Sequence, residues 1–208
     1  MFPDAARAHL SGAVIPIRAF ALGKARLAAS LDGAERAALG RHWAEQVVRA
    51  AAPMPVVVVS SDPDVRAWAA ELDLAVLDDP GTLDGAATVG RDHLRALGCR
   101  RAVIAHADLP RAHDLDRLAR DGGRPIVALV PCHRDDGTPV LSVPTAVDFR
   151  FAYGPGSFRR HALEARRLGL GLRVVRDPDL AFDVDVPDDL AALGALGALG
   201  ALPESITS

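Results

Sequence analysis

The sequence predicts an α/β fold of three layers, in which helices cover both faces of a mostly parallel, Rossmann-like sheet. Short apolar runs alternate with segments of helical periodicity along most of the chain. Such alternation is typical of parallel sheets, because the connection between two parallel strands is usually a helix. The run of four valines at Val56–Val59 also suits a strand that is buried on both faces.

Helix signals and apolar runs then place the individual elements. Asp32 and Glu35 form a capping-box pattern, and Asp62 precedes Pro63 as an N-cap acid precedes a first-turn proline. The expected strands are 13–17, 56–59, 75–77, 102–105, 126–130, 140–143, 149–151 and 172–175. The expected helices are 32–51, 62–72, 86–97, 111–120 and 157–168, with a weak last helix that opens at 187.

The composition is that of a folded protein without a strongly charged partner. The chain has 208 residues, of which 50% are hydrophobic and 25% charged, and its formal net charge is −3. At ~150 residues per domain, we expect a single domain over 1–208, with loose ends at 1–12 and 195–208. The mixed charges give no reason to expect nucleic acid or an anionic membrane as a partner. Cys99 and Cys132 lack metal-ligand spacing.

The amino-terminal segment and the apolar runs indicate a cytoplasmic protein. Met1–Gly12 mixes acidic and basic side chains and has no apolar core, unlike a signal peptide. No apolar run approaches the ~18 residues that a membrane span needs. The sequence does not determine the oligomeric state, and a homodimer is one state that it allows.

Basic residues gather in the loop after the first expected strand. Arg18, Lys24 and Arg26 stand among small and apolar residues, and Lys24 is the only lysine of the chain. A strand followed by such a loop suits a phosphate group, although the Walker spacing is absent. The alternative is that these are solvated surface charges, which the retention of a single lysine here disfavours.

Carboxylates follow strands in the middle and near the end of the chain. Asp108 stands just past the strand at 102–105, where parallel sheets place metal ligands; its alternative role is to cap the next helix. Alternation puts Asp183 and Asp185 on the same side of an extended segment. Two such carboxylates repel each other unless a cation lies between them, so these three residues are candidate metal ligands.

A glycine-rich turn enters the helix expected at 157–168. Gly154 and Gly156 allow close approach to the backbone, and Ser157 can cap the helix while its free amides face an anion. The alternative is an ordinary Gly-Pro-Gly turn followed by an N-cap. The turn is therefore a candidate anion site.

Together these segments suit the transfer of a nucleotidyl group. Basic residues come early in the chain, a carboxylate midway, an anion-binding helix start later and an acidic pair last. That set fits Mg²⁺-assisted attack at phosphorus. The GxSxG, HExxH and GxGxxG motifs are absent, which disfavours the hydrolase, zinc-protease and dinucleotide-binding classes that use them.

Seven motifs occur in a fixed order between about residues 13 and 193: PIRAFALGKARL, VVVVSSDP, VLDDPGTLDGAA, AHADLP, DGTPVL, FAYGPGSFRRH and FDVDVPDDL. In this order they resemble the CofC/FbiD family, the 2-phospho-L-lactate or phosphoenolpyruvate guanylyltransferases of deazaflavin coenzyme F-420 biosynthesis. The family lies within the MobA-like nucleotidyltransferases. The resemblance therefore implies their three-layer α/β/α fold, of the nucleotide-diphospho-sugar transferase type.

The resemblance also implies a role for each candidate residue in binding GTP, a small phosphorylated carboxylic acid or Mg²⁺. The catalytic residues that it implies are Lys24, Arg18 and Asp108. The residues that it implies for the acid acceptor are Thr138, Gly154 and Ser157. Those implied for the nucleotide are Ser61, Asp79, Gly81 and Asp84. The implied Mg²⁺ ligands are Asp108, Asp183 and Asp185.

Four positions depart from the usual motifs of that family. Arg18 replaces a lysine, Thr82 and Asp84 replace the glycine and the asparagine of a GLN segment, and Pro139 replaces the asparagine of a GTN segment. A carboxylate at position 84 replaces a donor with a charge that would repel a phosphate.

Two other functions stay open at this point. Another MobA-like nucleotidyltransferase, with a molybdopterin or sugar-phosphate acceptor, would keep Asp108 and Asp185 and change the pocket around Thr138–Ser157. A non-catalytic nucleotide-binding module would fit the departures at Asp84 and Pro139.

Overall fold

The computed structural model describes residues 11–20, 31–121, 124–134 and 136–184. The strands in these ranges are β1 Ser11–Pro16, β2 Val56–Val59, β3 Ala75–Leu77, β4 Arg101–Ala105, β5 Ile126–Val130, β6 Val140–Pro144 and β7 Gly171–Val174. The helices are α1 Gly33–Ala51, α2 Pro63–Glu71, α3 Leu83–Ala96 and α4 Ser157–Arg167, with a short 3₁₀ helix, η2, at Leu115–Ala119.

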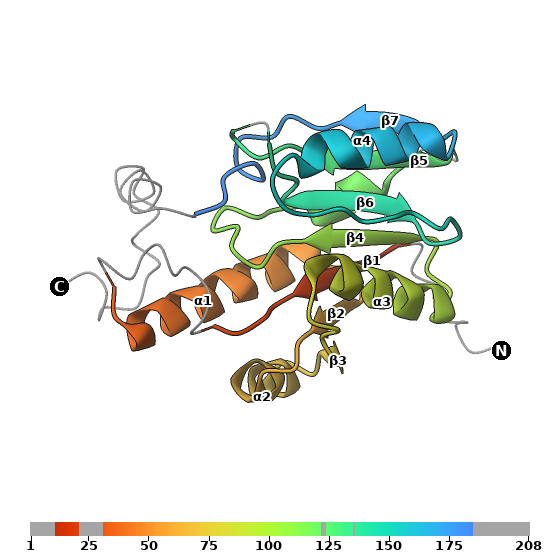
Figure 1. Ribbon diagram of the computed structural model, residues 1–208. Helices are drawn as coiled ribbons and strands as arrows, with labels where there is room; N and C mark the ends of the chain where they lie inside the picture. The colour runs from red at the N-terminus through yellow and green to blue at the C-terminus, as the bar shows by residue number, and fades with distance from the viewer. Residues whose placement is uncertain (1–10, 21–30, 122–123, 135, 185–208) are drawn as a thin grey trace, which may run out of the picture.

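The strands form one seven-stranded sheet in the order β3-β2-β1-β4-β6-β5-β7 (Figure 1). β1, β2, β3 and β4 pair in parallel, as do β5 and β7. β6 runs antiparallel to both of its neighbours, β4 and β5. The sheet is thus mostly parallel, as the sequence predicts, with one reversed strand among those described.

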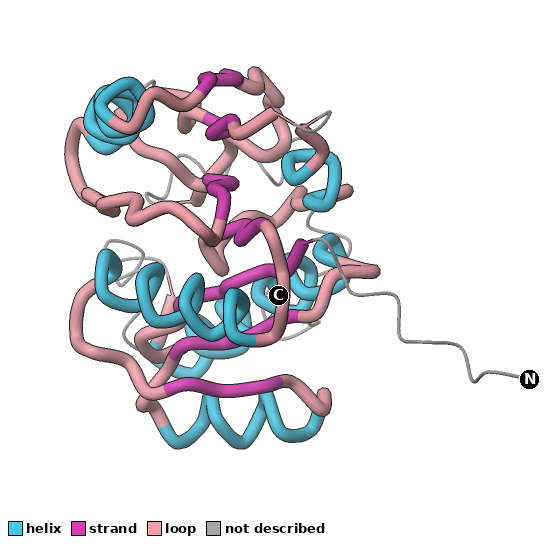
Figure 2. The backbone as a smooth tube through the Cα atoms, turned by 90° about the vertical axis from the view of Figure 1, so that its right-hand side faces the viewer, coloured by secondary structure: helices cyan, strands magenta, loops and turns pink. Residues whose placement is uncertain are grey.

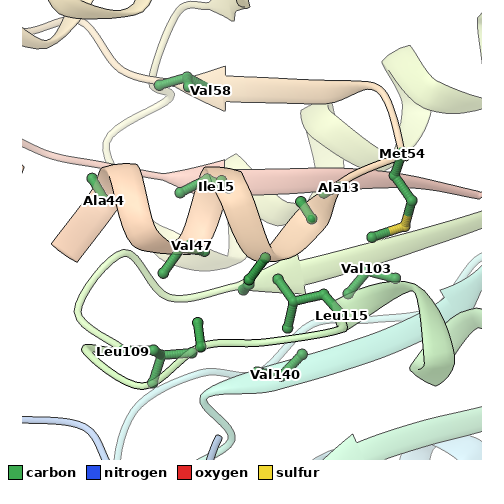
Figure 3. Packing of buried hydrophobic residues seen from close by; sticks show 14 of the residues in the cluster. Ala13, Ile15, Ala44, Val47, Met54, Val58, Val103, Leu109, Leu115 and Val140 are labelled. Atoms are coloured by element: carbon green, nitrogen blue, oxygen red, sulfur yellow. The ribbon is translucent and has the colours of Figure 1, made fainter. Parts of the chain in front are cut away.

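Helices cover both faces of the sheet, which confirms the three layers (Figure 2). Alternate residues of β1 point to opposite faces: Ala13 and Ile15 join the core beneath α1 and α2, whereas Val14 joins the core beneath α3 and α4. Ala44 and Val47 of α1 pack toward this first core (Figure 3). Both faces of the sheet are therefore apolar, which explains the continuous valine run.

Two glycines allow α3 to approach β1 closely. A Cβ atom on Gly90 of α3 would lie 2.3 Å from Val14 Cγ1, and one on Gly12 of β1 would lie 2.4 Å from Leu94 Cδ2. Such separations are far below van der Waals contact, so no larger residue fits without movement. This packing places the start of α3 beside the carboxyl edge of the sheet.

The helix starts largely follow the sequence signals. In the capping box of α1, the amide of Glu35 donates to Asp32 Oδ1 at 2.8 Å and the amide of Asp32 donates to Glu35 Oε2 at 2.7 Å. Asp62 caps α2 ahead of Pro63. α3 begins at Leu83, earlier than the expected 86, because the Thr82 side chain accepts from the Gly85 amide and caps the first turn.

Two expected elements are wrong in type. Residues 149–151 form no strand, because side chains satisfy this backbone in place of a neighbouring strand: the Arg150 amide donates to Glu164 Oε1, and Arg91 donates to the Phe149 carbonyl. The helix expected at 111–120 shrinks to η2, since Asp114 has a left-handed φ of 37°.

β1 begins at Ser11 and not at residue 13, so it takes in two residues that the sequence assigns to a loose end. The expected last helix lies outside the described residues. In the part of the chain that the structure describes, no helix combines the length and the apolar character needed to cross a membrane.

Candidate active site at the carboxyl edge of the sheet

The predicted site residues that the structure describes gather around one edge of the sheet. The parallel strands β1 to β4 end at this edge, and the reversed β6 begins there. The residues on the loops and helix starts of this region are Arg18, Ser61, Asp79, Gly81, Asp84, Asp108, Thr138, Gly154, Ser157 and Asp183. Lys24 and Asp185 lie outside the described residues.

Thr138 and Ser157 form a buried pair of hydroxyl groups. Their oxygens, Thr138 Oγ1 and Ser157 Oγ, lie 3.3 Å apart, and each residue is only 1% exposed. Thr138 stands just before β6 and Ser157 is the first residue of α4, so the fold joins two segments for which the family resemblance implies the same acceptor.

A histidine to which the sequence assigns no role contacts this pair. His161 is fully buried on α4, and its Nδ1 lies 3.1 Å from Thr138 Oγ1. Its Nε2 accepts the Ala152 amide at 3.0 Å. Burial, with smaller contributions from Arg160 and His106, lowers the pKa of His161 to about 4, so the ring is neutral near pH 7.

The turn before α4 corrects the expectation that Ser157 caps the helix. Gly156 is the N-cap, with a φ of 74°, and Gly154 has a φ of 94°. The Gly156 amide donates to Asp136 Oδ1 at 2.7 Å, and the Phe158 amide donates to the Asp136 carbonyl at 3.1 Å. A protein carboxylate thus occupies the helix start where the sequence predicts a ligand anion.

The segments implied for the nucleotide are tied to one another and to this turn. The Asp79 amide donates to Ser61 Oγ at 3.0 Å, and the Gly81 amide donates to Asp79 Oδ1 at 2.8 Å. Asp84, at the start of α3, accepts the Tyr153 amide at 2.6 Å. The Asp84 carboxylate therefore has a main-chain donor, and an asparagine oxygen could accept the same bond.

Asp108 and Asp183 bring carboxylates to the same edge, and the Oδ1 atom of each is buried. The alternative role of Asp108 as a helix cap is excluded, because η2 begins only at Leu115. Asp183 Oδ1 lies 3.3 Å from His133 Nδ1. Carboxylate oxygens are the ligands that Mg²⁺ prefers, so the chemistry of these two side chains suits a divalent cation.

A second group, His113, Asp177 and Asp179, also offers ligand atoms within 4.8 Å of one another. Asp177 pairs with Arg117 and Asp179 pairs with Arg111, so guanidinium groups already balance both carboxylates. Asp177 Oδ1 also accepts the amide of Leu180 at 3.0 Å. We interpret this group as an ion-pair network that holds the segment leading to Asp183.

Asp136 and His161 are the residues that the sequence analysis missed. One signal for His161 was present, because it follows Ser157 by four residues and so lies on the same face of the helix. The partner of Asp136 is a main-chain amide 20 residues away, and no local pattern marks such a contact.

Comparison with known proteins gives one consistent family. Residues 11–198 match the family model described as guanylyl transferase CofC like. A phosphoenolpyruvate guanylyltransferase of Sphaerobacter thermophilus is 37% identical over 188 residues, which cover 87% of this chain and 91% of that protein. A 2-phospho-L-lactate guanylyltransferase of Methanothermobacter thermautotrophicus is 31% identical over 187 residues, which cover 87% and 82% of the two chains.

Two solved structures show a similar fold. A candidate nucleotide-diphospho-sugar transferase from Desulfovibrio desulfuricans superposes with a TM-score of 0.71 at 17% identity, covering 89% of this chain and 86% of that one. A CMP:2-keto-3-deoxy-manno-octonic acid synthetase complexed with CTP gives a TM-score of 0.57 at 15% identity, covering 91% and 99%. At these identities the likeness concerns the fold alone.

Proposed function

This chain belongs to the CofC family of guanylyltransferases, and we propose that it joins GMP from GTP to phosphoenolpyruvate or 2-phospho-L-lactate in coenzyme F-420 biosynthesis. The observation that carries the proposal is the buried Thr138–Ser157 hydroxyl pair at the sheet edge that also carries Asp108 and Asp183. Hydroxyl donors suit the anionic groups of a small phosphorylated acid. Carboxylates suit the cation that accompanies a nucleoside triphosphate.

The reaction that we propose is an in-line displacement at the α-phosphorus of GTP. A phosphate oxygen of the acceptor forms the new P–O bond, and the bond from the α-phosphorus to the bridging oxygen of pyrophosphate breaks. The electron pair leaves with pyrophosphate. The attacking phosphate oxygen is already an anion near pH 7, so no side chain has to remove a proton from it. Catalysis then depends on positioning and on neutralising charge.

We assign the divalent cation to Asp108, Asp183 and Asp185, of which the first two are described. Mg²⁺ bound there would reduce the negative charge of the triphosphate. The His113 group is a poorer candidate, because arginines already face its two carboxylates.

The other predicted site residues are assigned to the phosphate groups and to the nucleotide. Arg18 is exposed after β1, where its guanidinium can reach a phosphate from solvent, and we assign the same role to Lys24, which lies outside the described residues. We assign the nucleotide to Ser61, Asp79, Gly81 and Asp84. Ser61 Oγ accepts the Asp79 amide, which leaves the hydrogen of that hydroxyl for a ligand. A Cβ on Gly81 would meet no atom within 4 Å, so the backbone there is open to one.

Pyrophosphate release tests the proposed function. The protein is incubated with Mg²⁺, GTP and, in separate reactions, phosphoenolpyruvate, 2-phospho-L-lactate or 3-phosphoglycerate, with ATP in place of GTP as the nucleotide control. We expect release with GTP and one of the first two acids, and a guanylylated acid as the product. Absence of pyrophosphate with every acid would reject the function and favour a non-catalytic nucleotide-binding module.

A further inference from the structure

We propose that His161 is a positioning residue that directs one hydroxyl hydrogen of the Thr138–Ser157 pair toward the anionic group of the acceptor. The inference rests on the proposed function, because it assumes that this pair binds the acceptor. His161 itself does not touch the acceptor in this scheme. It acts through Thr138, whose Oγ1 lies 3.1 Å from its Nδ1.

The partners of the imidazole ring fix its tautomer. A backbone N–H can only donate, so His161 Nε2, which lies 3.0 Å from the Ala152 nitrogen, carries no proton. The ring is neutral near pH 7, because burial lowers its pKa to about 4. Its one proton therefore resides on Nδ1, and the ring donates to Thr138 Oγ1.

The direction of that bond decides how many hydroxyl hydrogens remain for a ligand. Thr138 and Ser157 have two between them, and the 3.3 Å contact between their oxygens uses one. When His161 donates to Thr138, the second hydrogen stays free for an acceptor. If Nδ1 instead accepted from Thr138, Ser157 would have to donate to Thr138 and no hydroxyl hydrogen would remain.

The backbone around His161 keeps this arrangement in place. The Ala152 amide that fixes Nε2 belongs to the turn before α4, and the Arg160 side chain donates to the carbonyls of Ala152 and Tyr153 at 2.9 Å each. His161 and Ser157 stand one turn apart on the same helix. The tautomer is thus set by main-chain geometry and not by the ligand.

Two substitutions separate the donor role of His161 from its role in the fold. In His161→Gln the side-chain oxygen reaches the position of Nε2 and can accept the Ala152 amide, but nothing donates to Thr138. In His161→Asn the amide nitrogen reaches the position of Nδ1 and can donate to Thr138, but the Ala152 amide loses its acceptor. The pair is matched, since each variant keeps one bond and loses the other.

We expect His161→Gln to raise the KM for the acid acceptor roughly five- to tenfold, the effect of one hydrogen bond near a charged group. The KM for GTP and kcat should change by less than about twofold. His161→Asn should keep an acceptor KM within about twofold of wild type although its melting temperature falls. Equal increases in the acceptor KM for both variants, or an equal increase in the KM for GTP, would overturn the proposal.

A double-mutant cycle and a spectrum complete the test. Because His161 acts through Thr138, His161→Gln should add nothing to the acceptor KM of Thr138→Val, and effects that multiply would contradict this.

Nitrogen-15 NMR, with the His161 signals assigned by their loss in His161→Asn, should show Nδ1 protonated and Nε2 without a proton near pH 7. The opposite tautomer overturns the proposal. A wild-type protein without activity would reject the proposed function and, with it, this inference. Active variants whose KM values do not change as expected would reject the inference alone.

Discussion

Asp108 is the residue whose charge we expect to matter most for turnover. Its carboxylate follows β4, beside the loops assigned to both substrates. Asp108→Asn keeps the size of the side chain and removes its charge. We expect kcat to fall by about 10²-fold or more, the scale of losing charge stabilisation in a transition state, while the melting temperature stays within a few degrees of wild type. Pyrophosphate release at saturating GTP and acceptor, over a titration of Mg²⁺, measures this.

Asp148→Asn is the matched control for that substitution. The Asp148 side chain is 91% exposed, so removal of its charge should change neither turnover nor the Mg²⁺ requirement. Full activity of Asp108→Asn, or an equal loss in both variants, would remove Asp108 from the metal site.

His161 also predicts how the stability of the protein depends on pH. Its folded-state pKa of about 4 lies below the ordinary histidine value of ~6.5. Between these two pH values the unfolded chain binds a proton that the folded chain does not, so the free energy of unfolding falls as the pH falls. From pH 7 to pH 4.5, wild type should lose about 2 kcal/mol more than His161→Gln. Urea unfolding of both proteins at each pH measures the difference, and parallel losses would show that His161 titrates normally.

Single residues also show how far the sequence predicts the site. Ser157 is visible as a hydroxyl after a glycine-rich turn, and Asp108 is visible because it follows an apolar run, whereas only the family resemblance indicates Thr138. The contact of Thr138 with His161 spans 23 residues of chain, and the fold, not a local pattern, creates it. The same reason explains why the sequence predicts a Ser157 cap where the structure has Gly156 and Asp136.

At the scale of one helix, α3 and α1 each contain a glycine in their middle, but the two glycines have different surroundings. A Cβ on Gly90 of α3 would lie 2.3 Å from Val14, whereas one on Gly40 of α1 would lie 3.6 Å from Phe20, an ordinary contact. Alanine favours a helix over glycine by ~1 kcal/mol. We therefore expect Gly40→Ala to raise the free energy of unfolding by up to about 1 kcal/mol.

Gly90→Ala should do the opposite. Its methyl group overpacks the contact with β1, at a cost of roughly 1–3 kcal/mol that exceeds the gain in helix propensity. Urea denaturation of the two variants alongside wild type distinguishes them. Stabilisation by Gly90→Ala would mean that α3 can move away from the sheet without cost.

Residues 149–151 show a limit of predicting secondary structure from the spacing of apolar residues. The buried, alternating residues Phe149 and Phe151 have the pattern of a strand, yet side chains of α3 and α4 bind this backbone instead. Periodicity reports which side chains are buried, and it does not report what satisfies the main chain between them. The capping signals at Asp32 and Asp62 are reliable for a related reason, because a cap concerns only neighbouring residues.

At the scale of the whole molecule, the reversal of β6 is what the sequence could not predict. The apolar run Val140–Val143 is buried on both faces. Its pattern therefore does not indicate whether the strand runs parallel or antiparallel to its neighbours. The reversal matters for the site: because β6 starts at the carboxyl edge, Thr138 lies directly before it and reaches Ser157. A parallel β6 would have placed Thr138 at the opposite edge of the sheet. The fold class thus follows from the sequence, and the contact between Thr138 and Ser157 follows from one strand direction.

The hydrogen bond from the Tyr153 amide to Asp84 links the two halves of the proposed site, since Asp84 starts α3 on the nucleotide side and Tyr153 enters the turn on the acceptor side. If one ligand tightens this contact, the other meets a turn that is already ordered. Linkage then requires each substrate to raise the affinity for the other by the same factor. With a non-reactive GTP analogue we expect acceptor affinity to rise about fivefold, a coupling of roughly 1 kcal/mol.

Calorimetric titration of each ligand, with and without the other, measures that factor in both directions. Asp84→Asn keeps an oxygen that can accept the Tyr153 amide, so it should keep the coupling. In Asp84→Ala, the factor by which one ligand raises the affinity for the other should fall close to one. A coupling that survives Asp84→Ala would have another route. A coupling lost in Asp84→Ala would make GTP and the acid allosteric effectors of each other through one main-chain hydrogen bond, and the protein would then favour the ternary complex over either half-filled state.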